Sequence, residues 1–82
     1  MKTYQATKEG KKAFVEEMVK PLILSMDDCW DDVSYEYQSG IGEYVTLKNK
    51  NPEKTIEVNV TGDSLNGVVS DIFTKLLLNH LI

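Results

Sequence analysis

Residues 55–61 read TIEVNVT, and this short run decides how the rest of the chain is interpreted. Apolar and polar side chains alternate strictly along it, with Ile56, Val58 and Val60 on one side. Strict alternation is typical of a β-strand that has one buried face and one solvated face. The sequence therefore predicts a strand here, and an apolar layer that covers its inner face.

Two earlier segments alternate in the same way and predict two more strands. The first covers residues 33–38, and the second covers residues 43–48. Their inward residues are expected to be Val33, Tyr35, Tyr37, Val45 and Leu47. Gly40 and Gly42 mark a tight connection between them, and the polar run 49–53 marks a second turn. Links this short favour an antiparallel meander, because parallel neighbours need long crossovers.

Helical periodicity precedes the strands, from residue 7 to residue 29. The expected buried stripe consists of Phe14, Met18, Leu22 and Met26, with Val15, Val19 and Ile23 beside them. Pro21 interrupts this stripe, and its ring clashes with the carbonyl four residues back. Because the stripe continues past Pro21, a kinked helix is expected near residues 17–20 rather than two separate helices.

A second helix follows the third strand and is expected to reach the C-terminus. Either Asp63 or Ser64 can cap its first turn. Its buried residues are expected to be Leu65, Val68, Val69, Ile72, Phe73, Leu76 and Leu77. The last residues are more apolar than one helical stripe requires. Leu78, Leu81 and Ile82 are therefore interpreted either as contacts to a second copy or another partner, or as a cap on the core.

These segments predict a single α+β domain over residues 1–82 with the element order α-β-β-β-α. Each strand has one apolar face, so both helices are expected to pack on that face of a three-stranded antiparallel sheet. The other face carries hydroxyl and charged side chains together with Tyr44. That outward face is interpreted either as a solvated surface or as a recognition surface.

Acidic residues are concentrated in one part of the chain. Residues 21–47 contain no Lys or Arg, although the chain has nine basic residues and a net charge of -4. The acids of this window are Asp27, Asp28, Asp31, Asp32, Glu36 and Glu43. Such a patch attracts a basic partner, with Trp30 as an aromatic anchor. The alternatives are a merely solvated connection, and a Trp30 that is buried as a lid on the core.

The residues that catalysis or metal binding needs are missing. Acids flank Cys29, which raises the pKa of a thiol, and the lone His80 lies in the last turn of a helix. The run 27–32 lacks the alternating acids, central Gly and terminal Glu of a calcium loop. We therefore expect a protein that is not an enzyme, with no cofactor and no metal.

The compartment follows from the cysteine count and the hydropathy. A single cysteine cannot form an internal disulfide, so a reducing cytoplasm is expected. No apolar run approaches the ~20 residues that a membrane span needs, so no membrane association is expected.

The predicted order of elements resembles that of the double-stranded-RNA-binding domain. That family places basic residues at the start of its second helix, where they contact phosphates. The matching positions here are Asp63, Ser64, Leu65, Asn66 and Gly67, none of which is basic. The resemblance implies a nucleic-acid-binding module as the alternative function, with a basic spot at Lys8, Lys11 and Lys12. The missing phosphate contacts argue against nucleic acid as a partner.

A second resemblance covers residues 54–78, under a third of the chain. The strand that ends in Val58-Asn59-Val60-Thr61, then Gly62-Asp63-Ser64 and an apolar helix, is similar to a segment of small accessory proteins of Gram-positive phages and mobile elements. It implies a non-enzymatic protein that works through contacts, a set that includes inhibitors of host defence nucleases such as anti-CRISPR proteins. The leading hypothesis is an acidic interaction protein that binds a basic surface.

Overall fold

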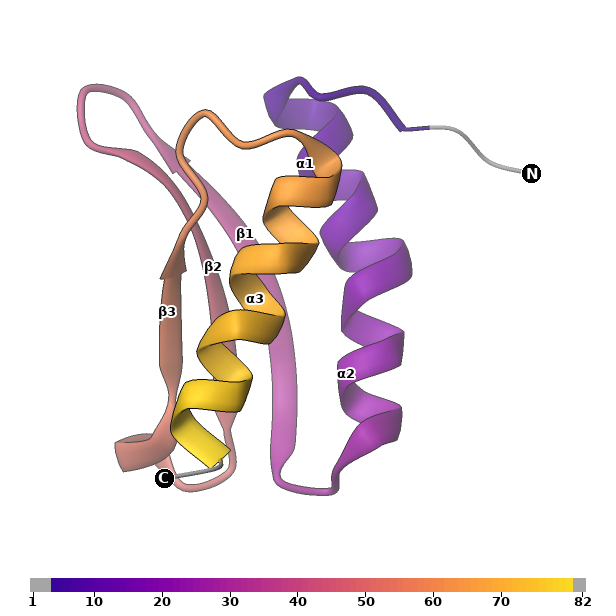
Figure 1. Ribbon diagram of the computed structural model, residues 1–82, viewed down its shortest axis with the longest axis vertical. Coiled ribbons are helices and arrows are strands. Elements are labelled where there is room, and N and C mark those ends of the chain that lie inside the picture. Colours follow the sequence, from indigo (N-terminus) through magenta and orange to yellow (C-terminus); the bar gives the residue numbers. More distant parts are fainter. Residues whose placement is uncertain (1–3, 81–82) are drawn as a thin grey trace.

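Figure 1 shows a computed structural model in which helices cover one face of a three-stranded sheet. The structure describes residues 4–80. The elements follow the order helix, three strands, helix, so the predicted α+β class is confirmed. The shortest dimension of the molecule is 18 Å, as expected for one layer of helices on one sheet.

The sheet is the predicted antiparallel meander, in the order β1-β2-β3. Its strands are β1 (Trp30–Gln38), β2 (Gly42–Asn49) and β3 (Ile56–Asn59). The β1–β2 connection requires glycine at Gly42, which has φ of +137° and leaves no space for a Cβ beside Thr61 Oγ1. The Glu43 N–H donates to the same Thr61 oxygen at 2.9 Å, and this bond ties the start of β2 to the end of β3.

The register of the sheet places the alternating residues as predicted, although Tyr37, which was expected on the inner face, is 44% exposed. Tyr35 lies opposite Val45, and Val45 lies opposite Val58, so one inward row crosses all three strands. A bulge between Trp30 and Asp32 shifts the register at the start of β1. Because of this extra residue, the Trp30 side chain joins the buried side of the sheet along with the later inward residues of β1.

The N-terminal helix passes Pro21 without a break. It consists of α1 (Lys8–Phe14), η1 (Val15–Val19) and α2 (Lys20–Met26). The middle part is a π-helical turn, in which the Lys20 N–H donates to the Val15 carbonyl five residues back. A wider turn just before Pro21 accommodates a residue that has no N–H and whose ring needs space. The predicted disturbance therefore takes the form of a π turn.

One of the two apolar rows of this helix is buried, and the π turn keeps that row on one side. The buried row advances by four residues and consists of Lys11, Val15, Val19 and Ile23. A row with this spacing drifts around an ordinary α-helix, and a wider turn reduces the drift. The expectation that Met18, Leu22 and Met26 are buried was wrong, since these side chains are 53%, 50% and 57% exposed.

The second helix, α3 (Leu65–His80), begins with Ser64 as its cap, whose Oγ accepts from the Gly67 N–H at 3.1 Å. Three of its residues, Val68, Ile72 and Leu76, are buried. Leu77 was expected in the buried stripe but is 57% exposed. Leu78 was expected to fall outside that stripe, and this is confirmed.

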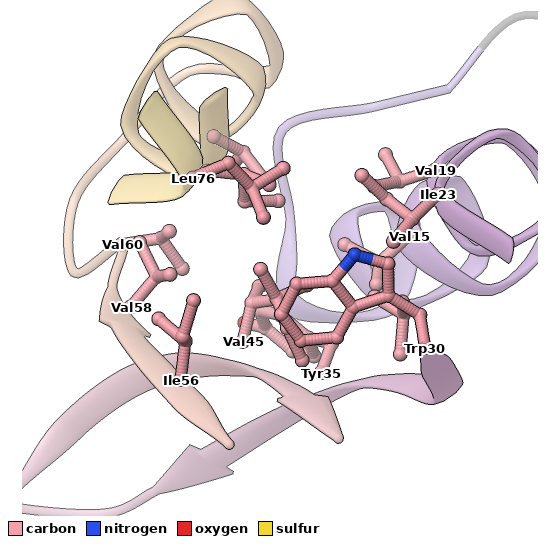
Figure 2. Close-up of a cluster of buried hydrophobic side chains, with 14 residues drawn as sticks. Val15, Val19, Ile23, Trp30, Tyr35, Val45, Ile56, Val58, Val60 and Leu76 are labelled. Atoms are coloured by element: carbon pink, nitrogen blue, oxygen red, sulfur yellow. The ribbon is translucent and has the colours of Figure 1, made fainter. Parts of the chain in front are cut away.

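The buried residues of both helices and of the inner sheet face form one core. Figure 2 shows this core, with Val15, Val19 and Ile23 on one side and Leu76 on the other. Trp30 lies between them. α3 packs on the β3 side of the sheet, whereas the N-terminal helix packs on the β1 side.

Candidate functional site

The six acids of residues 21–47 do not form one surface. Four of them lie where α2 leads into β1, but Glu36 and Glu43 lie near the far end of the sheet. Glu36 is exposed on the outward face, opposite Tyr44. Glu43 lies opposite Tyr37 and, being two residues before Val45 on β2, belongs to the same inner face of the sheet. The structure therefore separates Glu36, Glu43 and Tyr44 from the other predicted binding residues.

Glu43 is occupied inside the fold. The Lys11 Nζ lies 2.7 Å from Glu43 Oε2, and their side chains are only 4% and 13% exposed. Lys11 is the N-terminal member of the buried row, which brings its ammonium group to the start of β2. A buried pair of this kind is a structural element, so Glu43 is removed from the candidate surface.

Other titratable groups lie close to the Lys11–Glu43 pair. Burial, followed by the charge of Glu43, raises the pKa of Tyr35 to about 12. A hydrogen bond with the Asp71 carboxyl, followed by burial, raises the pKa of Asp63 above its ordinary value of 3.8. This end of the sheet thus holds a partly buried polar cluster.

Asp32 is neutralised by a lysine from just outside the acidic window. The Lys20 Nζ lies 2.8 Å from Asp32 Oδ1, and both side chains are partly exposed. A hydrogen bond from Lys20 lowers the pKa of Asp32, and the same bond raises the pKa of Lys20. Asp31 lies farther from its nearest lysine, with 3.9 Å between Asp31 Oδ2 and Lys48 Nζ.

Three acids remain exposed at the turn between α2 and β1, and we call Asp27, Asp28 and Asp31 the acidic corner. The Asp27 side chain is held by the local backbone, because its Oδ1 accepts from the Cys29 N–H at 3.2 Å. Asp28 has no ion pair among residues 4–80. Burial, followed by the charge of Asp27, raises the pKa of the Cys29 thiol and so disfavours a nucleophilic thiolate.

Trp30 lies beneath this corner and not on its surface. Its side chain is 6% exposed, so it is the core lid and does not project as an anchor. Above it is a hollow of about 240 Å³ between the ends of α2 and α3. The hollow is lined by Met26, Asp27, Trp30, Phe73, Leu76 and Leu77. An acidic corner and an apolar hollow are therefore neighbours through Asp27.

The predicted dimer contacts lie elsewhere. Leu78 lines a different groove, beside β3, together with Tyr44. Leu81 and Ile82 lie outside the described residues. Half-exposed apolar side chains that sequence reasoning missed lie along Met18, Leu22 and Met26 and at Leu77.

The predicted basic spot on the first helix does not form. Lys11 is buried in its pair with Glu43. The Lys8 Nζ lies 4.5 Å from the centre of the Tyr37 ring. Of the three lysines, only Lys12 is exposed without a described contact.

No His, Cys, Asp or Glu side chains within residues 4–80 form a group of three that could hold a metal ion. None of the helices described is long and apolar enough to cross a bilayer. Comparisons with protein-family models, with curated proteins and with solved structures give no match. The case for the acidic corner therefore depends on its geometry and charge.

Proposed function

We propose that this chain is a small, acidic, non-enzymatic protein that binds a basic surface of a protein partner through the acidic corner. The observation that carries the proposal is the exposure of Asp27, Asp28 and Asp31 beside an apolar hollow. Clustered carboxylates accelerate the encounter with a basic surface, and an adjoining apolar area supplies affinity once the surfaces meet. An inhibitor of a host defence nuclease, as the similarity of residues 54–78 to phage accessory proteins implies, is one protein of this kind.

The test compares two triple variants that lose the same charge. The first carries Asp27→Asn, Asp28→Asn and Asp31→Asn, and the control carries Glu36→Gln, Glu53→Gln and Glu57→Gln on other exposed sites. A partner captured from a lysate of the cells that encode the chain is titrated against both. At low salt the first variant is expected to bind about tenfold more weakly, since three exposed charges at about 0.5 kcal/mol each together reach the roughly 1.4 kcal/mol of a tenfold change.

Salt provides a second readout of the same experiment. Wild type and control are expected to lose affinity as salt increases, whereas the corner variant should respond less. Equal affinities for both triple variants at every salt concentration would contradict the proposal. A gel shift with DNA and RNA at low salt checks the nucleic-acid alternative, and no shift is expected.

A further inference from the structure

The two flanks of the N-terminal helix face different neighbours. On one flank, Lys8 lies over Tyr37 and Lys20 pairs with Asp32, so this flank faces β1. The row of Met18, Leu22 and Met26 lies on the other side of the buried row. Met26 reaches the hollow that Phe73 and Leu77 of α3 also line, so this second flank faces α3.

The result is an apolar groove between the two helices, which we call the inter-helix groove. Its hollow is lined by Met26, Trp30, Phe73, Leu76 and Leu77, and we extend it to the exposed Met18 and Leu22, which precede Met26 in the same helical row. Figure 1 shows α2 and α3 splaying apart toward their C-terminal ends, and the hollow lined by Met26 and Leu77 lies between these ends. Four of its apolar side chains are at least half exposed, and exposed apolar side chains that lie together, unlike scattered single ones, mark a candidate interaction site.

The dimensions of the groove suit a helix. In the exposed row of the N-terminal helix, Met26 comes eight positions after Met18, which is a rise of about 12 Å. Partner helices bind such grooves through anchors at positions i, i+3 or i+4, and i+7, which span about 10 Å. Methionine side chains, which supply two of the three residues in this row, adapt to different anchors because they are flexible and polarisable.

The charges around the groove determine the chemistry of that helix. Asp27 forms part of the hollow, and Asp28 and Asp31 follow it at the same end. No lysine lines the hollow, and Lys20 is turned toward Asp32 on the other flank. An occupant with Lys or Arg near one end would therefore pair with the acidic corner while its apolar side fills the groove.

We infer that the inter-helix groove binds an amphipathic helix of the partner protein, with basic residues placed against Asp27, Asp28 and Asp31. This inference rests on the proposed function and names the element that the corner recognises. A second copy of the chain fits less well, because it would bring a molecule with a net charge of -4 onto an acidic rim.

The probe is a synthetic 18-residue helical peptide with Leu at i, i+4 and i+7 and Lys at its polar positions. A control peptide has the same Leu row with Glu in place of Lys. The single tryptophan, Trp30, lies at the floor of the groove, so its fluorescence reports binding directly. We expect micromolar binding of the Lys peptide with a change in Trp30 emission, and at least tenfold weaker binding of the Glu peptide.

Two neighbouring leucines provide a matched pair of variants. Leu77 and Leu78 are 57% and 55% exposed, but Leu77 lines the groove and Leu78 faces the β3 side. Leu77→Ser is expected to lower the affinity for the Lys peptide about tenfold, and Leu78→Ser is expected to lower it less than twofold. Both side chains are exposed, so both variants should keep the wild-type melting temperature, which circular dichroism checks.

Each result decides between the alternatives. Equal effects of Leu77→Ser and Leu78→Ser, or equal binding of both peptides, would overturn the inference. A dimer in light scattering that Leu77→Ser dissociates would also overturn it and would assign the groove to a second copy. If the triple Asn variant binds the captured partner more weakly than wild type but Leu77→Ser does not, the groove inference fails while the proposed function stands. The opposite pattern would remove the acidic corner from the interaction.

Discussion

The two ends of the sheet use acidic residues in opposite ways. At the hairpin end, Glu43 is buried against Lys11 at 2.7 Å. At the α2–β1 end, about 20 Å away along the strands, Asp27 and Asp28 are exposed. All three acids come from the same lysine-free stretch of sequence. The difference shows that lysines brought in by the fold decide which acids remain available to a partner.

The largest expected effect concerns the hairpin end. Lys11→Ala leaves the Glu43 carboxylate buried without its cation and should lower the free energy of unfolding by about 3 kcal/mol. Urea unfolding at pH 7 measures this loss. As the control, Lys20→Ala removes a partly exposed pair that solvent screens, and should cost far less than Lys11→Ala. A loss below about 1 kcal/mol for Lys11→Ala would mean that Glu43 is better solvated than its burial indicates.

A second variant tests whether the pair stabilises the fold or only avoids a buried charge. Lys11→Met combined with Glu43→Leu replaces both charges by apolar groups of similar length. The double variant should recover stability to within about 1 kcal/mol of wild type, because apolar replacements of buried ion pairs are often neutral. If it is as unstable as Lys11→Ala, the pair itself is required.

The carboxyl of Asp63 is expected to oppose folding at neutral pH. Its pKa is raised by the hydrogen bond with Asp71 and by burial, so the folded state binds a proton more tightly than the unfolded state. Stability should therefore fall as pH rises above about 4. Asp63→Asn keeps a donor toward Asp71 and should raise the free energy of unfolding by about 1 kcal/mol at pH 7. Unfolding curves from pH 4 to pH 7 measure both effects, and an unchanged pH profile would contradict this account.

The Lys20–Asp32 pair should give a smaller pH effect of the opposite sign. Because Lys20 lowers the pKa of Asp32, the pair stabilises the fold above pH 3.8 and loses this effect as pH falls further. Solvent screens this partly exposed pair, so its contribution should be smaller than that of Asp63. The difference in urea midpoint between wild type and Asp32→Asn should accordingly shrink between pH 7 and pH 3. If this difference in urea midpoint instead grows toward pH 3, the Lys20–Asp32 pair does not stabilise the fold in the way described.

The strands could be predicted from the sequence because apolar and polar residues alternate in them, and this alternation matches which side chains are buried. Ile56, Val58, Val45 and Leu47 occupy alternate positions, and each faces the core as its phase requires. The same alternation places Glu43 on the inner face of the sheet. In the N-terminal helix, residues spaced by four from Val19 include Lys11, so Lys11 lies on the buried side. Both signals were present in the sequence but only their combination predicts a buried pair.

The surface of the N-terminal helix could not be predicted in the same way. Phe14, Met18 and Leu22 form an apolar row as regular as the row that is buried, and periodicity alone does not choose between them. The structure buries the row of Val15, Val19 and Ile23, and tertiary packing against the sheet makes this choice. The inter-helix groove was missed because its members are far apart in sequence and meet only when α3 packs beside α2.

The most direct test of the central claim measures stability and binding on the same triple variant, with Asp27→Asn, Asp28→Asn and Asp31→Asn. The account predicts a free energy of unfolding within about 0.5 kcal/mol of wild type, because these side chains are exposed. It predicts that the affinity for the Lys peptide falls about tenfold at low salt. Unchanged affinity, or a loss of stability large enough to explain weaker binding, would contradict the assignment of the acidic corner as the interaction surface.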